Sequence, residues 1–89
     1  MRISSKYKVH NVADENIVLI QGRNPGDMTT VIALNDTSLF LWNRLEGRDF
    51  VPDDVTRLLV DNYEVDNATA SADALKWVGM LQQNNILEP

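Results

Sequence analysis

The hydrophobic pattern changes its period near Asn35, and this change limits the folds that the chain can adopt. Residues 7–12 alternate apolar and polar side chains, which is the period of a half-buried strand. Residues 17–20 form a short β-branched run, which favours a strand buried on both faces. Residues 28–34 alternate again, with their even positions on the expected core face. Turn residues separate the three strands, so we expect antiparallel hairpins.

Three helices follow, and capping residues indicate where each helix begins or ends. Asn35 can cap the first turn of the first helix, and Gly47 stands where a left-handed cap ends it. The second helix begins at Pro52, which is tolerated in a first turn, and runs to about Tyr63. Either Asp66 or Asn67 caps the third helix, and Asn85 is a plausible left-handed end. Apolar residues at helical spacing form the expected core stripes: Leu39, Leu41, Trp42, Leu45, Val55, Leu58, Leu59, Tyr63, Ala70, Ala74, Trp77 and Leu81.

The order of elements is therefore three strands followed by three helices. A chain of 89 residues is expected to form one domain. Three helices cannot all bury their apolar faces on a three-stranded sheet, so a small helix cluster with the hairpin sheet against it is the favoured arrangement. We predict a single α+β domain over residues 1–89, winged-helix-like, with three antiparallel β-strands followed by three α-helices.

Composition excludes several kinds of site. The chain has no cysteine, which excludes a disulfide scaffold, a thiolate metal site and a cysteine nucleophile, and which suits a reducing compartment. Its one histidine, His10, lies in a strand pattern and cannot build a multi-histidine metal site. No apolar run approaches the roughly 18 residues of a membrane span, and the first ten residues lack a signal-peptide core. We expect a cytoplasmic protein without a bound metal, cofactor or membrane contact.

The charge is unevenly distributed and disfavours nucleic acid as a partner. The net charge is −5, yet residues 1–8 carry three basic side chains, Arg2, Lys6 and Lys8. Residues 9–89 carry five basic and thirteen acidic side chains. Proteins bind nucleic acid mainly through Lys and Arg side chains that contact the phosphates, so the acidic residues 9–89 would repel DNA. A winged-helix DNA-binding or regulatory domain is the alternative, and an accessory subunit of an enzyme is a third possibility.

No catalytic set is apparent in the sequence, so we expect a binding module and not an enzyme. The acidic residues lack the alternating ligand spacing of a calcium loop and are explained by helix capping. Trp42 is expected in the core. Trp77 is also expected there, with a partly exposed groove position as the alternative. Gly79 lies within a helix, where glycine costs about 1 kcal/mol relative to alanine; either a close backbone approach or tolerance on a solvated face would explain it.

Residues 34–47, which read LNDTSLFLWNRLEG, closely resemble the hallmark of the PqqD-like family, named for coenzyme pyrroloquinoline quinone synthesis protein D. The Tyr63-Glu64-Val65 ending of the second helix and the Ala- and Leu-rich third helix add to the resemblance, which covers almost the whole chain. Two positions depart from the family pattern: Arg44 and Gly79 stand where the family usually has apolar residues.

The resemblance implies a function. Members of this family are peptide chaperones that bind the leader segment of a ribosomally made precursor peptide and present it to a modifying enzyme, often a radical SAM protein. The leader adds as a strand to the third strand and lies against the third helix. We expect a monomer or weak dimer. The matching positions on the strand are Met28, Thr29, Thr30, Val31, Ile32, Ala33 and Leu34, and those on the helix are Asp73, Trp77 and Met80.

Overall fold

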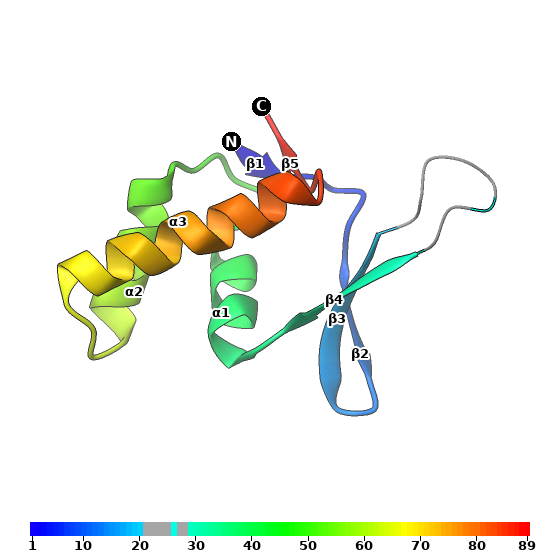
Figure 1. Cartoon of the computed structure of the whole chain (residues 1–89), viewed down its shortest axis with the longest axis horizontal. Helices are drawn as coiled ribbons and strands as arrows, with labels where there is room; N and C mark the ends of the chain where they lie inside the picture. Colours follow the sequence, from blue (N-terminus) through cyan, green and yellow to red (C-terminus); the bar gives the residue numbers. More distant parts are fainter. Residues whose placement is uncertain (21–25, 27–28) are drawn as a thin grey trace.

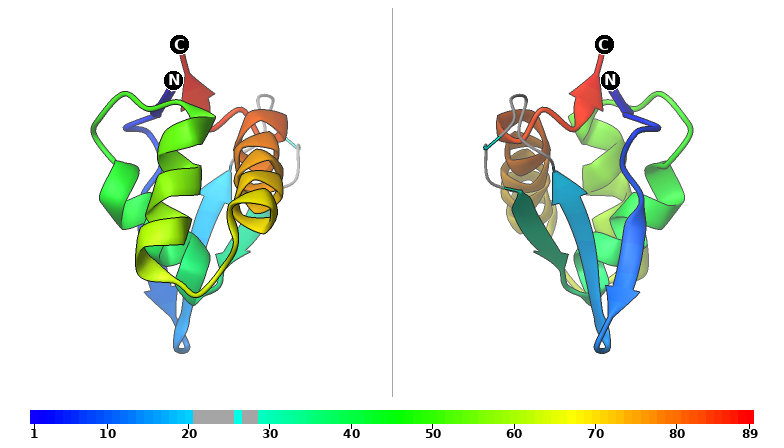
Figure 2. Two further views of the ribbon diagram at one scale, coloured as in Figure 1. Left: turned by 90° about the vertical axis from the view of Figure 1, so that its left-hand side faces the viewer. Right: turned by 90° about the vertical axis from the view of Figure 1, so that its right-hand side faces the viewer.

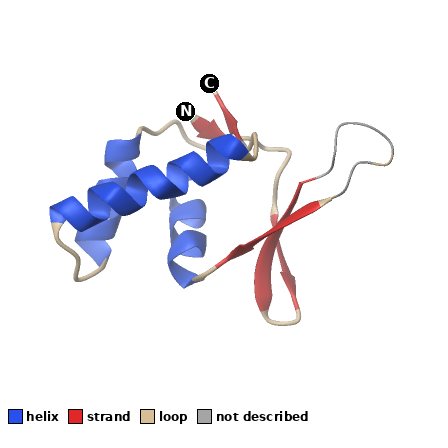
Figure 3. Ribbon diagram, viewed as in Figure 1, coloured by secondary structure: helices blue, strands red, loops and turns tan. Residues whose placement is uncertain are grey.

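The computed structural model describes residues 1–20, 26 and 29–89 (Figure 1). Within these residues the chain forms an α+β fold, as predicted: a three-stranded antiparallel sheet precedes three helices (Figure 3). Two short strands at the ends of the chain complete it. The elements are β1 (Arg2–Ile3), β2 (Val9–Val12), β3 (Glu15–Ile20), β4 (Thr30–Leu34), α1 (Asp36–Leu45), α2 (Pro52–Asn62), α3 (Asn67–Gln83) and β5 (Leu87–Glu88).

The larger sheet has the order β2-β3-β4, with both pairs antiparallel. Its inner face is apolar and packs against the helices. Val18, at the centre of this face, is fully buried. The prediction that this middle strand is buried on both faces is wrong, since Leu19 is 43% exposed. The helices lie on one side of the sheet only (Figure 3), so the alternate side chains of β3 face outward.

A two-residue turn joins β2 to β3. Ala13 and Asp14 both have left-handed backbones, with φ of 51° and 65°. Positive φ at both central residues is the geometry of the type I′ turn, whose twist matches that of the flanking strands. Val12 and Glu15 pair directly across this turn, which fixes the register of the hairpin. The sequence pattern indicated a turn at residues 14–16, but Glu15 and Asn16 already belong to β3.

N-cap side chains accept hydrogen bonds from the first turns of α1 and α3. Asn35 caps α1, its Oδ1 accepting from the Ser38 N–H at 2.8 Å. Asp66, and not Asn67, caps α3, because its Oδ1 accepts from the Thr69 N–H at 2.7 Å. The Thr69 backbone and hydroxyl donors lower the pKa of Asp66 below its ordinary value of 3.8.

Left-handed residues follow two helix ends where the sequence places them. Gly47, with φ of 82°, lies just beyond the C-cap of α1, and Asn85, with φ of 56°, lies beyond α3. Both positions were predicted as left-handed ends. A glycine or asparagine adopts this conformation at low cost, which explains why these residue types stop the helices.

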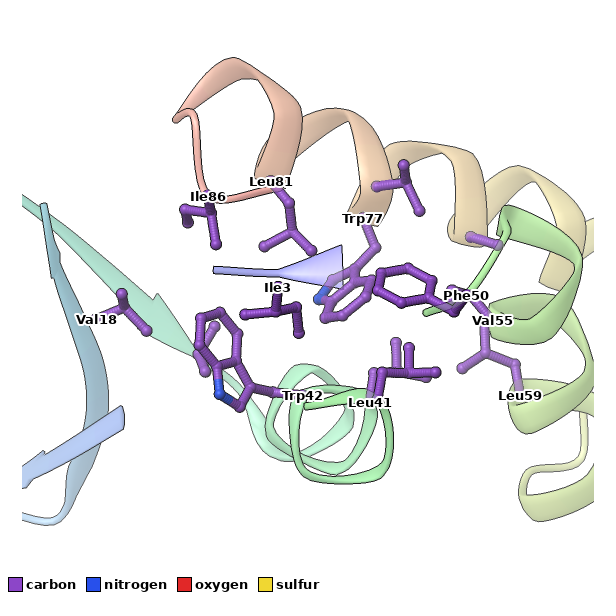
Figure 4. Packing of buried hydrophobic residues seen from close by; sticks show 14 of the residues in the cluster. Ile3, Val18, Leu41, Trp42, Phe50, Val55, Leu59, Trp77, Leu81 and Ile86 are labelled. Atoms are coloured by element: carbon purple, nitrogen blue, oxygen red, sulfur yellow. The ribbon is translucent and has the colours of Figure 1, made fainter. Parts of the chain in front are cut away.

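The core lies between the three helices and the inner face of the sheet. Figure 4 shows the side chains of Trp42, from α1, and Trp77, from α3, in this core together with Ile3 from β1. The Trp42 indole donates to Glu46 Oε2 at 3.0 Å, which satisfies its buried N–H. The prediction that Trp42 is a core residue is confirmed. The buried apolar residues are Ile3, Val18, Leu34, Leu41, Trp42, Leu45, Phe50, Val55, Leu59, Ala70, Ala74, Trp77, Val78, Leu81 and Ile86.

Arg44 departs from the family pattern on an exposed surface of α1. Its guanidinium carbon lies 5.3 Å from the centre of the Phe40 ring. Phe40 in turn meets Tyr63 edge-on, with ring centres 5.7 Å apart. Arginine over an aromatic face gains a cation–π attraction, so the charged residue covers the apolar ring in place of an apolar neighbour.

The two ends of the described chain pair with each other. β1 and β5 run antiparallel, with Arg2 opposite Glu88 and Ile3 opposite Leu87. This small sheet was not predicted, although Ile86 and Leu87 were expected to fold back onto the helices. Among the described residues, α3 is the longest helix, and neither it nor the others has the length and apolar character needed to cross a membrane.

Candidate functional site

β4 is an edge strand, with β3 on one side and no strand pairing on the other among the described residues. The two-residue turn determines which of its backbone groups face outward. Val12 and Glu15 flank that turn and therefore form a hydrogen-bonded pair, and such pairs alternate along an antiparallel ladder. The alternation makes Val18 direct its backbone groups toward its partner on β4, Ile32.

It follows that Val31 and Ala33 direct their N–H and C=O groups away from β3, toward the free edge. An unpaired row of this kind can accept an additional strand. The side chains of these two residues lie on the outer face of the sheet, where Val31 is 56% exposed beside its partner Leu19. Ile32 and Leu34 point the other way, toward the helices. The sequence pattern predicted this division of the strand for both pairs of residues. It also predicted Thr30 as a core residue, which is wrong, since Thr30 is exposed at the start of the strand.

α3 lies on the same side of the molecule as β4, and β2 lies on the opposite side, in both views of Figure 2. Asp73, Trp77 and Met80 are spaced four and three residues apart, so they share one flank of α3. Asp73 is exposed, Met80 is half-buried, and Trp77 is only 7% exposed. The core interpretation of Trp77 is therefore confirmed over the exposed groove position. Its Nε1 has no hydrogen-bond acceptor among the described residues.

The predicted strand residues differ in their exposure and in whether they belong to β4. Leu34 is 5% exposed and belongs to the core, so its side chain is not available at the surface. Thr29 is exposed but precedes β4, which begins at Thr30 and not at Met28 as the sequence pattern indicated. Met28 itself lies outside the described residues.

Two hollows adjoin the end of β4, and neither was predicted. The first, called here the indole hollow, has a volume of about 270 Å³, and its lining includes Asn35, Ser38, Leu41, Leu59, Asp73 and Trp77. The second, called the acidic hollow, has a volume of about 350 Å³, and its lining includes Asp14, Glu15, Ala33, Leu34, Asn35 and Asp36. Asn35 and Ser38 line both hollows.

The hollows join residues that are far apart in the sequence. Glu15 and Leu59, for example, come from β3 and α2, yet both lie near the first turn of α1. A local sequence signal could not bring such residues together, because their proximity depends on how the hairpin and the helices pack around Asn35.

The described residues show few of the features that metal binding or DNA binding would need. No cluster of three His, Asp or Glu side chains among them could hold a metal ion. α3 carries a single basic side chain, Lys76, which would give it little attraction for phosphate. His10 is exposed on β2, as predicted for a histidine on a strand surface.

Comparison with known proteins identifies the family. The family model described as "Coenzyme PQQ synthesis protein D (PqqD)" matches residues 15–87. The fold is similar to that of TbiB1, solved in complex with the TbiA(beta) leader peptide, with a TM-score of 0.72 and 24% identity over 99% of this chain and 95% of that chain. The chain has no match among the curated proteins. The family match spans β3 to β5 and confirms the resemblance carried by residues 34–47: the chain belongs to the coenzyme PQQ synthesis protein D family.

Proposed function

We propose that this protein is a non-catalytic module that binds the leader segment of a ribosomally made precursor peptide and presents it to a modifying enzyme. The observation that carries the proposal is the free edge of β4 on the α3 side of the molecule, in a chain of the PqqD family. TbiB1, which has the same fold, is a protein solved with a leader peptide. In this proposal the leader adds to β4 as a further strand.

The backbone alone cannot account for such binding. Val31 and Ala33 offer four outward backbone groups, and each hydrogen bond contributes about 0.5–1.5 kcal/mol net. The resulting total of about 2–6 kcal/mol reaches only the low end of the roughly 4–15 kcal/mol that association costs, which leaves little or no net affinity. Contacts with side chains on α3 must supply the remainder, and with it the preference for one peptide over another.

The site residues then have distinct roles. Val31 and Ala33 supply the hydrogen-bonding backbone, while Ile32 and Met80, both half-buried, supply apolar contact on the inner side. Asp73 is the exposed charged group of the helix wall. Two other predicted positions act less directly, because Trp77 and Leu34 support α3 and the strand from the core. Thr30 is the first residue of β4, and Thr29 precedes it.

The partner in this proposal is a modifying enzyme such as a radical SAM protein, and the reaction takes place on that enzyme. The chain has no cysteine and one histidine, His10, which lies on β2 away from β4. The proposal includes a cytoplasmic location, which suits a protein without cysteine. It also includes a monomeric or weakly dimeric state.

Titration of the ¹⁵N-labelled protein with the leader of any precursor peptide found encoded near its gene tests the proposal. We expect amide shifts concentrated in residues 30–34 and around Asp73, Trp77 and Met80. The scrambled leader serves as a control and should leave these amides unchanged. Shifts concentrated on α2 or β2, or the absence of any shift at millimolar peptide, would contradict strand addition at β4.

A further inference from the structure

The indole hollow combines an apolar floor with a polar rim. Leu41, Leu59 and Trp77 contribute apolar surface, whereas Asn35, Ser38 and Asp73 contribute polar atoms. A volume of about 270 Å³ is enough for one long side chain. Because Asn35 directly follows β4, a peptide paired with the strand would pass the mouth of this hollow as it reaches the Leu34 end.

The charge around the indole hollow determines which peptide side chain it would accept. Asp73 lies at the rim of the indole hollow, and Asp14, Glu15 and Asp36 line the adjoining acidic hollow. Neither lining includes a lysine or arginine among the described residues. The ion pair found in the described chain joins Arg2 to Asp49 and involves none of these carboxylates. The negative charge at this end of β4 is therefore left for a partner to balance.

Trp77 forms a fixed part of the floor. The residue is more than nine-tenths buried and belongs to the lining, so its ring offers a firmly held apolar surface to an incoming side chain.

We propose that the indole hollow selects leaders carrying a lysine or arginine at the position that pairs near Leu34. This inference rests on the proposed function and names the chemical class that the site prefers. The methylene stem lies against Leu41 and Leu59, and the cationic end reaches Asp73.

Other side-chain classes fit the hollow less well. An acidic side chain would meet like charge from Asp73 and from the neighbouring acidic hollow. A purely apolar side chain would fill the floor but would remove water from Asp73 without replacing its hydrogen bonds. A long side chain with a cationic end satisfies both the floor and the rim, as lysine and arginine do when they bury their stems.

Selection of random dodecapeptides by mRNA display on the full-length protein tests the inference. We expect the selected peptides to share a lysine or arginine at one aligned position. The same selection on Asp73→Asn should lose this preference, and on Asp61→Asn should keep it, because Asp61 is an exposed residue of α2 that lines neither hollow. Circular dichroism would show that both variants remain folded.

The outcomes separate this inference from the proposed function. If peptides are selected without a preferred basic position, or if Asp73→Asn keeps the preference, the hollow does not choose a cation, although peptide binding itself stands. If no peptide is selected at all, the proposed function is overturned together with the inference.

A double-mutant cycle on one selected peptide measures the contact itself. Replacing its basic residue by glutamine should weaken binding to the native protein by about three- to fivefold, as expected for a surface ion pair. The same replacement should have little effect on binding to Asp73→Asn. An equal loss for both proteins would overturn the pairing with Asp73.

Discussion

Gly79 lies in the middle of α3, and a Cβ added there would meet nothing within 4 Å. Close approach by another backbone, one of the two explanations considered from the sequence, therefore does not account for this glycine. Replacing it by alanine should raise the free energy of unfolding by about 1 kcal/mol, because alanine loses less backbone entropy in a helix. Urea denaturation followed by circular dichroism measures the change.

The matched control for this substitution is Gly47→Ala. Gly47 also has open space around it, but its φ of 82° is strained for a residue with a Cβ. This second variant should be less stable than the native protein. Two substitutions of the same kind would then shift stability in opposite directions, and a loss of stability in Gly79→Ala would contradict the account of α3.

Asp66 links the stability of α3 to pH. Hydrogen bonds from Thr69 depress its pKa in the folded state, so its stabilising effect is present above 3.8 and disappears as the pH falls through the lowered pKa. We expect Asp66→Ala to melt at a lower temperature than the native protein at pH 7. The difference should shrink below pH 3.8. Melting curves from pH 7 to pH 2 measure this effect.

Asp66→Asn is the control for that titration. The asparagine amide oxygen caps a helix without carrying a charge. The variant should therefore retain most of the stability at neutral pH while losing the pH dependence that the carboxylate contributes. A pH dependence equal to that of the native protein would show that another group is responsible.

At the scale of single elements, the backbone direction of β4 gives the sharpest test of strand addition. Val31→Pro removes an N–H that faces the free edge, so the sheet should stay folded while leader affinity falls about tenfold or more. Isothermal titration with the leader peptide measures the affinity, and circular dichroism measures the fold.

Ile32→Pro is the matched control on the neighbouring residue. Its N–H points toward Val18 on β3, so the substitution should break the ladder and lower the melting temperature sharply. Equal damage to the fold by both prolines would contradict the alternation derived from the two-residue turn.

Elements with strong local signals were predictable from the sequence. Asn35 and Gly47 mark the ends of α1 through cap chemistry, which acts within one turn of the chain. β1 and β5 were missed because two residues are too few to show a period, and their pairing depends on contacts across the whole chain. The faces of β3 were assigned wrongly because a short apolar run does not show whether one side or both sides will be covered.

The site was predictable only in part, and for a similar reason. Resemblance placed the strand and Asp73, Trp77 and Met80 in one region. It counted Leu34 among the peptide-binding residues, although the alternation of the strand had already placed Leu34 on the core face, where the structure has it. It also could not show the two hollows, because the first turn of α1 brings their residues together only in the folded state.

At the scale of the whole molecule, β1 ties the start of the described chain to the helical core. Ile3 is buried beside Trp42 and Trp77 (Figure 4) and pairs with Leu87 on β5. Ile3→Ala should lower the free energy of unfolding by about 2–5 kcal/mol, as for other large-to-small changes in a core. Chemical denaturation measures it, with Arg2→Ala as a neighbouring control on an exposed side chain. An effect no larger than that of the control would mean that β1 contributes little.

The pairing of β1 with β5 also decides how this fold could be attached to another protein. Residues opposite each other in an antiparallel pair lie about 5 Å apart, so the two ends leave the molecule side by side. Figure 1 places them at the top of the molecule, away from the Leu34 end of β4. The fold could therefore be spliced into a surface loop of a host enzyme without stretching it.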